Sequence, residues 1–151
     1  MKSGYTINDA EWDNREHDWT GKSFYFLPLT YIFYIPLGLG SKLDSLNREA
    51  RQAGYKILGK MVLIEHGMFK GRVAIEVEKL DNFDANRLDF DDKTKVYTMV
   101  YTGSPAQIGQ GIKRLTERVV SRGAMSPRSI FYMYSPKTAS GVYKTVIFAL
   151  T

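Results

Sequence analysis

Residues 104–123 read SPAQIGQGIKRLTERVVSRG, and they predict one amphipathic helix. Ser104 can cap this helix, with Pro105 at its first position and Gln107 completing a capping box. Gly123 supplies the left-handed residue that commonly ends a helix. The apolar residues recur in steps of 4, 3 and 4, the spacing of a single buried stripe: Ile108, Ile112, Leu115 and Val119.

The same pattern occurs 69 positions earlier in the chain. Pro36 precedes Pro105 by that offset (105 − 36), and Gly54 precedes Gly123 by it as well (123 − 54). The matching apolar stripe consists of Leu39, Leu43, Leu46 and Ala50. We therefore predict a first helix that is entered at Pro36, or that begins only at Ser41, and that ends at Gly54.

Extended segments surround both predicted helices. An aromatic run precedes each helix, and two segments with alternating apolar and polar residues follow it as a hairpin. The six segments, in chain order, are Phe24–Tyr34, Met61–Glu65, Arg72–Glu78, Lys95–Tyr101, Ile130–Tyr134 and Val142–Leu150. A unit of strand, helix, strand and strand is thus expected twice.

The predicted fold class is α+β, with two pseudo-repeated units forming an antiparallel sheet platform that carries two helices. Its segments are an N-terminal arm (1–22), half 1 (about 23–80), a linker (about 81–93) and half 2 (about 94–151). One unit alone would leave a sheet face open, so pairing the halves buries apolar surface and creates a cleft between them. We expect Trp12 and Trp19 of the arm to fold back onto this body.

Composition restricts the functional classes. The 151 residues include no Cys, which excludes disulfides, a thiolate nucleophile and Cys-based zinc sites. Residues 23–41 carry no charged side chain, but their prolines and glycines argue against a spanning helix, so no membrane partner is expected. Without a secretory signal, the expected localisation is cytoplasmic. The net charge is +5, and the bases gather on the two predicted helices.

Most catalytic and metal-binding motifs are missing from the sequence. The segment GLGSK, residues 38–42, lacks the spacing of a phosphate-binding loop. His17 and His66 do not form a zinc pattern, and the acids after Asp89 lack the glycine and the final Glu of a calcium loop. We therefore predict no catalytic residue, no metal site and no cofactor.

The candidate ligand site combines rings with acids. Alternation places Tyr97 and Tyr101 on one face of their strand, away from the predicted helix, and Tyr132 and Tyr134 on one face of theirs. In half 1 Glu65 occupies the place that corresponds to Tyr134 (134 − 65 = 69), and Glu76 lies on the polar face of the neighbouring strand. Both acids could compensate a cationic charge while the rings stack on the ligand. The alternative is that the tyrosines are ordinary sheet residues and that the two glutamates pair at the surface with Lys60 or Arg72.

The pattern resembles the gyrase-inhibitor-like, or bacterial transcription-activator effector-binding, superfamily. The resemblance rests on the duplication, on VYTMVYTG at 96–103 before a capped helix, and on IFYMYSP at 130–136. It implies a small-molecule cleft between the halves, since members include drug-sensing effector domains, a gyrase-binding inhibitor and some hydrolases. An acid that the family often carries on the second hairpin is missing from residues 129–135, so an acid would have to come from Glu65 or Glu76.

Two functional hypotheses follow, and an enzyme is less favoured than either. The first is a stand-alone module that binds an apolar or aromatic, optionally cationic, small molecule. The alternative is an interaction protein whose basic helices contact an acidic protein or nucleic acid, with nucleic acid the less expected of these partners. The arm has about 22 residues, too few for a helix-turn-helix, which excludes a one-component transcription factor.

Overall fold

The computed structural model describes residues 7–90, 93–123, 126–133 and 144–151. In this part of the chain an α+β fold combines short and long helices with one antiparallel sheet. The helices are α1 (Asp9–Trp12), α2 (Leu39–Gln52), the 3-10 helix η1 (Pro105–Gln107) and α3 (Ile108–Ser121). The strands are β1 (Arg15–Asp18), β2 (Ser23–Ile32), β3 (Ile35–Leu37), β4 (Ile57–Glu65), β5 (Lys70–Val77), β6 (Arg87–Asp89), β7 (Lys95–Thr102), β8 (Ser129–Met133) and β9 (Lys144–Leu150).

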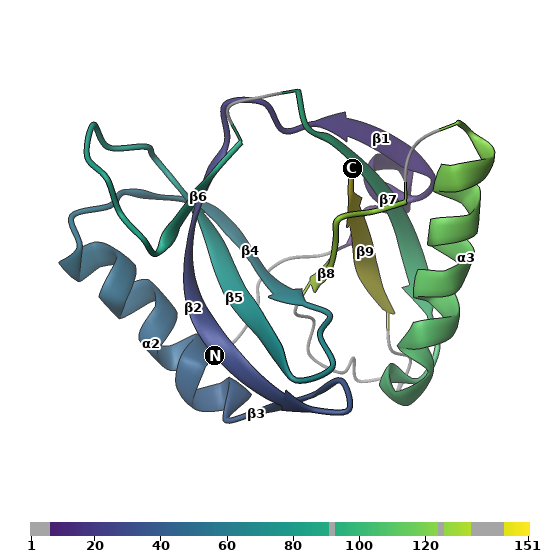
Figure 1. Cartoon of the computed structure of the whole chain (residues 1–151), viewed down its shortest axis with the longest axis horizontal. Coiled ribbons are helices and arrows are strands. Elements are labelled where there is room, and N and C mark those ends of the chain that lie inside the picture. Colours follow the sequence, from purple (N-terminus) through teal and green to yellow (C-terminus); the bar gives the residue numbers. More distant parts are fainter. Residues whose placement is uncertain (1–6, 91–92, 124–125, 134–143) are drawn as a thin grey trace.

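The sheet runs through the whole described molecule. Its strand order is β1-β7-β9-β8-β4-β5-β2-β3, with β6 paired to β2, and every pairing is antiparallel. The pairing of β4 with β8 joins the strands of the expected half 1 to those of half 2. Figure 1 shows the sheet curling between α2 on one side and α3 on the other.

The two long helices, α2 and α3, carry the predicted apolar residues and end just before the predicted glycines. Each has 14 residues, and α3 begins 69 positions after α2 (108 − 39). Leu46 and Leu115 are each 1% exposed, and Ala50 and Val119 are buried as well, whereas the first residue of each stripe, Leu39 or Ile108, is only partly buried. Gly54 and Gly123 follow the two helices with φ of +93° and +82°, a conformation that glycine adopts without a Cβ clash. The glycine stops are therefore confirmed.

The beginning of α3 differs from the prediction. Residues Pro105–Gln107 form η1, and α3 begins only at Ile108 with no side-chain cap. The Ser104 hydroxyl accepts a hydrogen bond from the Ala106 N–H at 3.3 Å, and the Ser104 carbonyl accepts from the Tyr101 hydroxyl at 3.1 Å. A 3-10 turn capped by the Ser104 hydroxyl thus stands in place of the predicted capping box.

The predicted entry to the first helix is also wrong. Residues 35–37 form β3, and α2 begins at Leu39 after a left-handed Gly38. The reason is a two-residue turn, in which Phe33 (φ +44°) and Tyr34 (φ +70°) reverse the chain so that Ile35 pairs with Ile32. Left-handed backbone costs a non-glycine residue about 1–2 kcal/mol, so this turn is strained.

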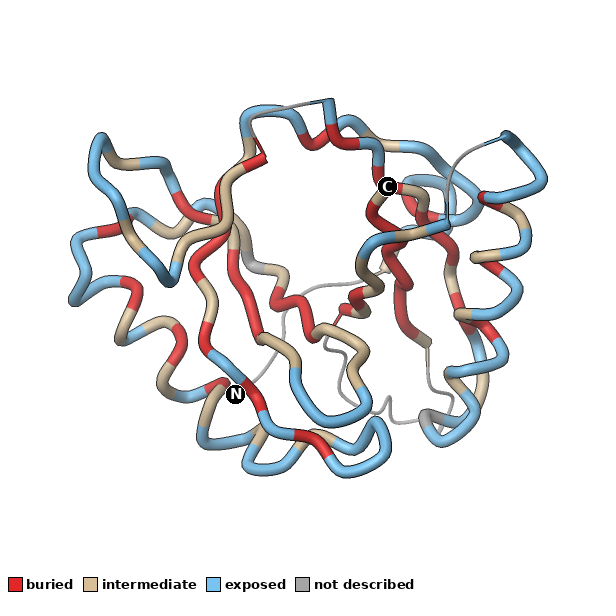
Figure 2. The backbone as a smooth tube through the Cα atoms, in the orientation of Figure 1, coloured by how far each residue is buried: buried red, intermediate tan, exposed pale blue. Residues whose placement is uncertain are grey.

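The core occupies both faces of the sheet. On one face α2 packs against β2, β4 and β5, and α3 packs against β7 and β9. Val73, Ile75 and Val77 lie under α2 as the alternation predicted, whereas Ala74 lies on the opposite face. Figure 2 shows the buried residues concentrated on the strands and on the inner sides of the long helices.

The arm and the linker cover the opposite face. Trp12 is 6% exposed and Trp19 is 4% exposed, and both pack with Phe24, Phe148 and other residues of the sheet, which confirms that the arm folds back. The segment expected as a linker contributes β6 and the buried Phe90 to this cover. We name these two faces the helix face and the arm face.

Candidate functional site

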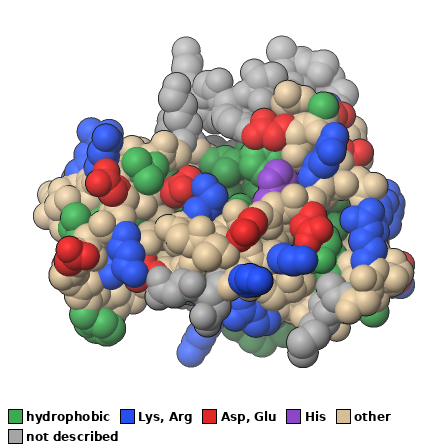
Figure 3. Space-filling view, turned by 90° about the horizontal axis from the view of Figure 1, so that it is seen from above, with side chains coloured by type: hydrophobic (Ala, Val, Ile, Leu, Met, Phe, Trp, Pro, Cys, Tyr) green, Lys and Arg blue, Asp and Glu red, His purple; other side chains and the backbone are tan. Residues whose placement is uncertain are grey.

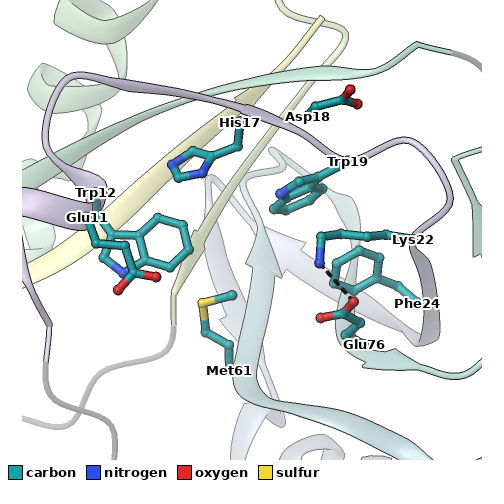
Figure 4. Close-up of a pocket in the computed structure, with 9 residues that line it drawn as sticks. All are labelled: Glu11, Trp12, His17, Asp18, Trp19, Lys22, Phe24, Met61 and Glu76. Atoms are coloured by element: carbon teal, nitrogen blue, oxygen red, sulfur yellow. Dashed lines mark hydrogen bonds and ion pairs between the residues drawn. The ribbon is translucent and has the colours of Figure 1, made fainter.

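A pocket of about 250 Å³ lies between the arm and the sheet. Its lining comprises aromatic, acidic and basic side chains, namely Glu11, Trp12, His17, Asp18, Trp19, Lys22, Phe24, Met61 and Glu76. Figure 3 shows this mixture on one face of the molecule, where a hollow with hydrophobic side chains is bordered by charged groups and a histidine. The close-up in Figure 4 shows the two tryptophan rings on either side of His17, with Met61 below them.

Strand β7 positions the arm side of the pocket. The buried Thr98 hydroxyl donates to the Trp12 carbonyl at 2.6 Å. The backbone N–H of Trp19 donates to the carbonyl of Thr94, just before β7, at 3.0 Å. His17 Nε2 lies 3.2 Å from Thr98 Oγ1. When Thr98 donates its proton to the Trp12 carbonyl, its oxygen accepts from His17 Nε2, which suits the tautomer that carries its proton on Nε2.

Phe148 supports both indole rings from the sheet. Its ring centroid lies 5.3 Å from that of Trp12 and 5.6 Å from that of Trp19. Trp19 also packs on Phe24 at 5.2 Å. Trp12 and Trp19 are only 6% and 4% exposed, so packing against the sheet holds both indole rings in place.

The pocket has a negative balance in a chain whose net charge is +5. Glu76 accepts a hydrogen bond from Lys22 at 3.0 Å, and their side chains are 23% and 38% exposed. Glu11 adds a second carboxylate beside Trp12, whereas Asp18 points away in Figure 4. The lining therefore holds more carboxylates than ammonium groups.

Burial keeps His17 uncharged near neutral pH. It lowers the pKa of His17, and the raising effect of Glu11 is smaller than this desolvation. The imidazole therefore adds no positive charge to the pocket at pH 7. No lining residue is a serine, threonine or cysteine, so the pocket has the features of a binding site and lacks a nucleophile of these types.

Among the predicted ligand-binding residues that the structure describes, Glu76 alone lines this pocket. Glu65 lies on the same face, where both its oxygens accept hydrogen bonds from Arg72 at 3.1 and 3.0 Å. Arg72 in turn lies over the rings of Phe26 and Phe131, at 5.2 and 5.7 Å. Glu65 thus forms the ion pair that the alternative interpretation expected.

The three predicted tyrosines that the structure describes lie outside the pocket, and the orientation predicted for Tyr97 and Tyr101 is wrong. Tyr97 and Tyr101 share a face, but it is the helix face, where they pack with α3. The physical reason is Gly111, since a Cβ there would lie 2.6 Å from the Tyr101 ring, so the missing side chain leaves room for it. Tyr132 packs against the α2 core. Tyr134 lies outside the described residues.

The sequence offered a partial signal for the residues that were missed. Trp12 and Trp19 were expected to fold back, but nothing in the pattern assigned them to a ligand. His17 was considered only as a metal ligand, and Lys22 and Met61 carry no motif. The pocket forms from segments that are distant in sequence, and only tertiary structure brings them together.

Neither a metal-binding cluster nor a comparison with other proteins identifies this pocket. Within the described residues, no group of three metal-ligating side chains comes together, and none of the helices has the length and apolarity to cross a bilayer. Comparison of the chain with protein-family models, curated proteins and solved structures found no match.

Proposed function

We propose that this protein is a binding module for a small cation with an apolar body, taken up in the pocket between the arm and the sheet. The observation that carries the proposal is the convergence of two indole rings and two carboxylates in a pocket of negative balance. Aromatic faces and nearby carboxylates both favour a cation over a neutral molecule of the same shape.

The volume favours a small ligand. Drug-sized molecules occupy pockets of roughly 300–1,000 Å³, and this pocket has about 250 Å³. A single aromatic ring that carries a quaternary ammonium group matches both the size and the charge. We therefore choose phenyltrimethylammonium as the probe, with tert-butylbenzene as its neutral isostere.

We also infer that the two halves are repeats of one ancestral unit, as the resemblance implies. The equal length of α2 and α3, their offset of 69 and the mirrored orders β2-β5-β4 and β7-β9-β8 support this inference. Superposition of the two units strand for strand, with Gly54 over Gly123, would agree with it. Different strand connections in the two halves would contradict it.

Fluorescence tests the binding proposal directly, because the chain has two tryptophans and both line the pocket. Phenyltrimethylammonium should change the tryptophan emission saturably, whereas tert-butylbenzene should bind at least several-fold more weakly. Glu76→Gln should weaken binding of the cation about fivefold, since a screened charge contact contributes about 1 kcal/mol. The same change should leave binding of the neutral isostere nearly unaltered.

Glu78→Gln is the matched control, because Glu78 lies two residues further along and is exposed outside the pocket. It should leave both affinities unchanged. Tyr101→Phe should also have no effect, since Tyr101 lies on the helix face. Absence of saturable binding, or equal losses in Glu76→Gln and Glu78→Gln, would refute the pocket as a cation site.

The basic helix α3 supports the second candidate, contact with an acidic partner. Lys113 and Arg114 are exposed on it, while Arg118 and Arg122 both donate to the Asn14 side chain, at 3.3 and 2.7 Å. A polyanion should then bind with strong salt dependence, and Arg114→Glu with Arg118→Glu should abolish that binding. Micromolar, salt-dependent binding of this kind without any response to small cations would favour this candidate over the first.

A further inference from the structure

Seven exposed apolar side chains gather at two neighbouring turns. We name this surface the aromatic tip, and its members and exposed fractions are Ile32 (52%), Phe33 (67%), Tyr34 (45%), Ile35 (65%), Leu37 (45%), Met68 (42%) and Phe69 (55%). They come from β2, the turn after it, β3 and the turn between β4 and β5. In Figure 1 both turns lie at the lower edge, and Figure 2 shows them mostly exposed. So many clustered apolar groups on a surface indicate an interaction site.

Hydrogen bonds and ring contacts join the two turns. The Tyr34 N–H donates to the Met68 carbonyl at 3.3 Å, and the Tyr31 N–H donates to the Phe69 carbonyl at 2.8 Å. The rings of Phe33 and Phe69 lie 5.7 Å apart, and Tyr34 stacks on His66 at 4.3 Å. The aromatic tip is therefore a preformed surface.

The residues at the strained turn do not suit its backbone. Two-residue hairpin loops with positive φ at both positions strongly prefer Asn-Gly, because these residues tolerate that conformation. Here Phe33 and Tyr34 occupy both positions. Stability alone would select other residues, so the strain indicates that the two exposed rings serve a function.

Charge identifies the class of partner. Residues 23–43 and 66–75, which contain the whole aromatic tip, include no Asp or Glu. Lys42 follows the tip at the start of α2, and the exposed Lys70 follows Phe69 directly. Exposed aromatic and aliphatic groups with adjacent lysines match the interface of an anionic bilayer.

The edge strand argues against a second copy as the partner. A copy that extended the sheet would pair with β3, which is the outer strand of the described sheet at this end. Pro36 stands in the middle of β3 and has no N–H to donate. Proline on an edge strand is a device that prevents strand addition.

We propose that the aromatic tip docks this protein on the surface of an anionic lipid bilayer. Docking of this kind needs no spanning helix, because the side chains enter only the interface. The proposal does not depend on the proposed ligand. Phe24 pairs with Glu76 at the pocket end of β2 and β5, whereas Thr30 pairs with Lys70 at the tip end of the same two strands. The two sites therefore lie near opposite ends of this strand pair.

Vesicle flotation of the full chain tests the proposal. The protein should float with vesicles of phosphatidylcholine and phosphatidylserine, and much less with phosphatidylcholine alone. Phe33→Ser with Phe69→Ser should reduce the bound fraction at least tenfold. Lys70→Glu should reduce it about fivefold or more, and added salt should remove that difference, because a lysine near an anionic surface acts electrostatically.

A second variant separates docking from folding. Phe33→Asn with Tyr34→Gly installs the residues that the turn prefers, so the Tm should stay level or rise by about 2–4 °C. The same variant should lose vesicle binding. If Phe33 and Tyr34 served only to stabilise the fold, this variant would lower the Tm.

Phe83→Ser is the matched control, because Phe83 is 93% exposed and lies outside the tip. It should float like the unmodified protein. The proposal is overturned if the unmodified protein binds neither vesicle, or if Phe33→Asn with Tyr34→Gly binds as well as it does. It is also overturned if the tip variants instead convert a dimer into a monomer by light scattering, which would identify a second copy as the partner.

Discussion

The two faces of the sheet are covered in different ways. On the helix face, apolar stripes of α2 and α3 meet apolar strand residues, and the rings of Tyr97 and Tyr101 pack against α3. On the arm face, aromatic rings mix with the ion pairs Glu65–Arg72 and Glu76–Lys22 under a short arm. The comparison indicates that the helix face mainly stabilises the fold, whereas the arm face combines packing with a pocket.

The largest expected effect is on the helix face. Leu115→Ala removes a side chain that is 1% exposed, and it should lower the free energy of unfolding by about 2–5 kcal/mol. Chemical denaturation measures this loss. Val120→Ala is the control on the same helix, because Val120 is 47% exposed and should change stability by less than about 0.5 kcal/mol. Similar losses in both variants would show that α3 is not packed as described.

On the arm face, Arg72→Met should cost about 1–3 kcal/mol, because it leaves the Glu65 carboxylate, 17% exposed, without its partner. The double variant with Glu65→Leu should recover part of this loss, since an apolar pair suits the rings of Phe26 and Phe131. Lys95→Met is the control, as it breaks an exposed ion pair with Glu16 and should cost at most about 1 kcal/mol. No recovery in the double variant would contradict this account.

A smaller effect should follow from loosening the arm. Thr98→Val removes the hydroxyl that donates to the Trp12 carbonyl, which should cost about 1 kcal/mol. Hydrogen exchange should then accelerate in β1 more than in β9, because β1 is an edge strand of the described sheet and pairs there with β7. Thr102→Val, at an exposed position of the same strand, should leave the exchange pattern unchanged. Equal acceleration in both strands would mean that the arm and the sheet open together.

The smallest expected effect is a dependence on pH. Burial lowers the pKa of His17 below its unfolded value of about 6.5, so the unfolded state binds a proton first as the pH falls. Stability should therefore decrease from about pH 6.5 downward, until the pKa of the folded state is passed. His17→Gln should flatten this decrease in urea denaturation at successive pH values. His66 has a pKa lowered by burial too, so a residual slope should remain.

The helix face could be predicted from the sequence to a large extent. Helical spacing identified the two stripes, and the glycine stops at Gly54 and Gly123 followed from backbone sterics alone. Alternation showed that Tyr97 and Tyr101 share a face of their strand. It could not show whether that face meets the helix or the arm, because both faces of this strand carry apolar side chains. Gly111 carried the missing information, since a glycine inside a helix leaves room for a ring.

The arm face could be predicted only in part. The return of Trp12 and Trp19 followed from their size and apolarity, but their partners did not, because Thr98 lies 86 positions after Trp12. The β2–β3 turn was missed because Phe33 and Tyr34 are not turn residues. Both failures concern positions where long-range packing or function outweighs local preference.

The pairing of the arm with β7 also determines when the chain can complete its fold during synthesis. The arm is synthesised before β7 and β9, which contact Trp12 through Thr98 and Phe148. Contacts across such long stretches of chain form slowly, because loop closure must precede them. The Trp12 indole cannot pack on Phe148 until β9 has been synthesised, whereas Trp19 can already contact Phe24 of the first half. Burial of Trp12 therefore requires both halves of the chain.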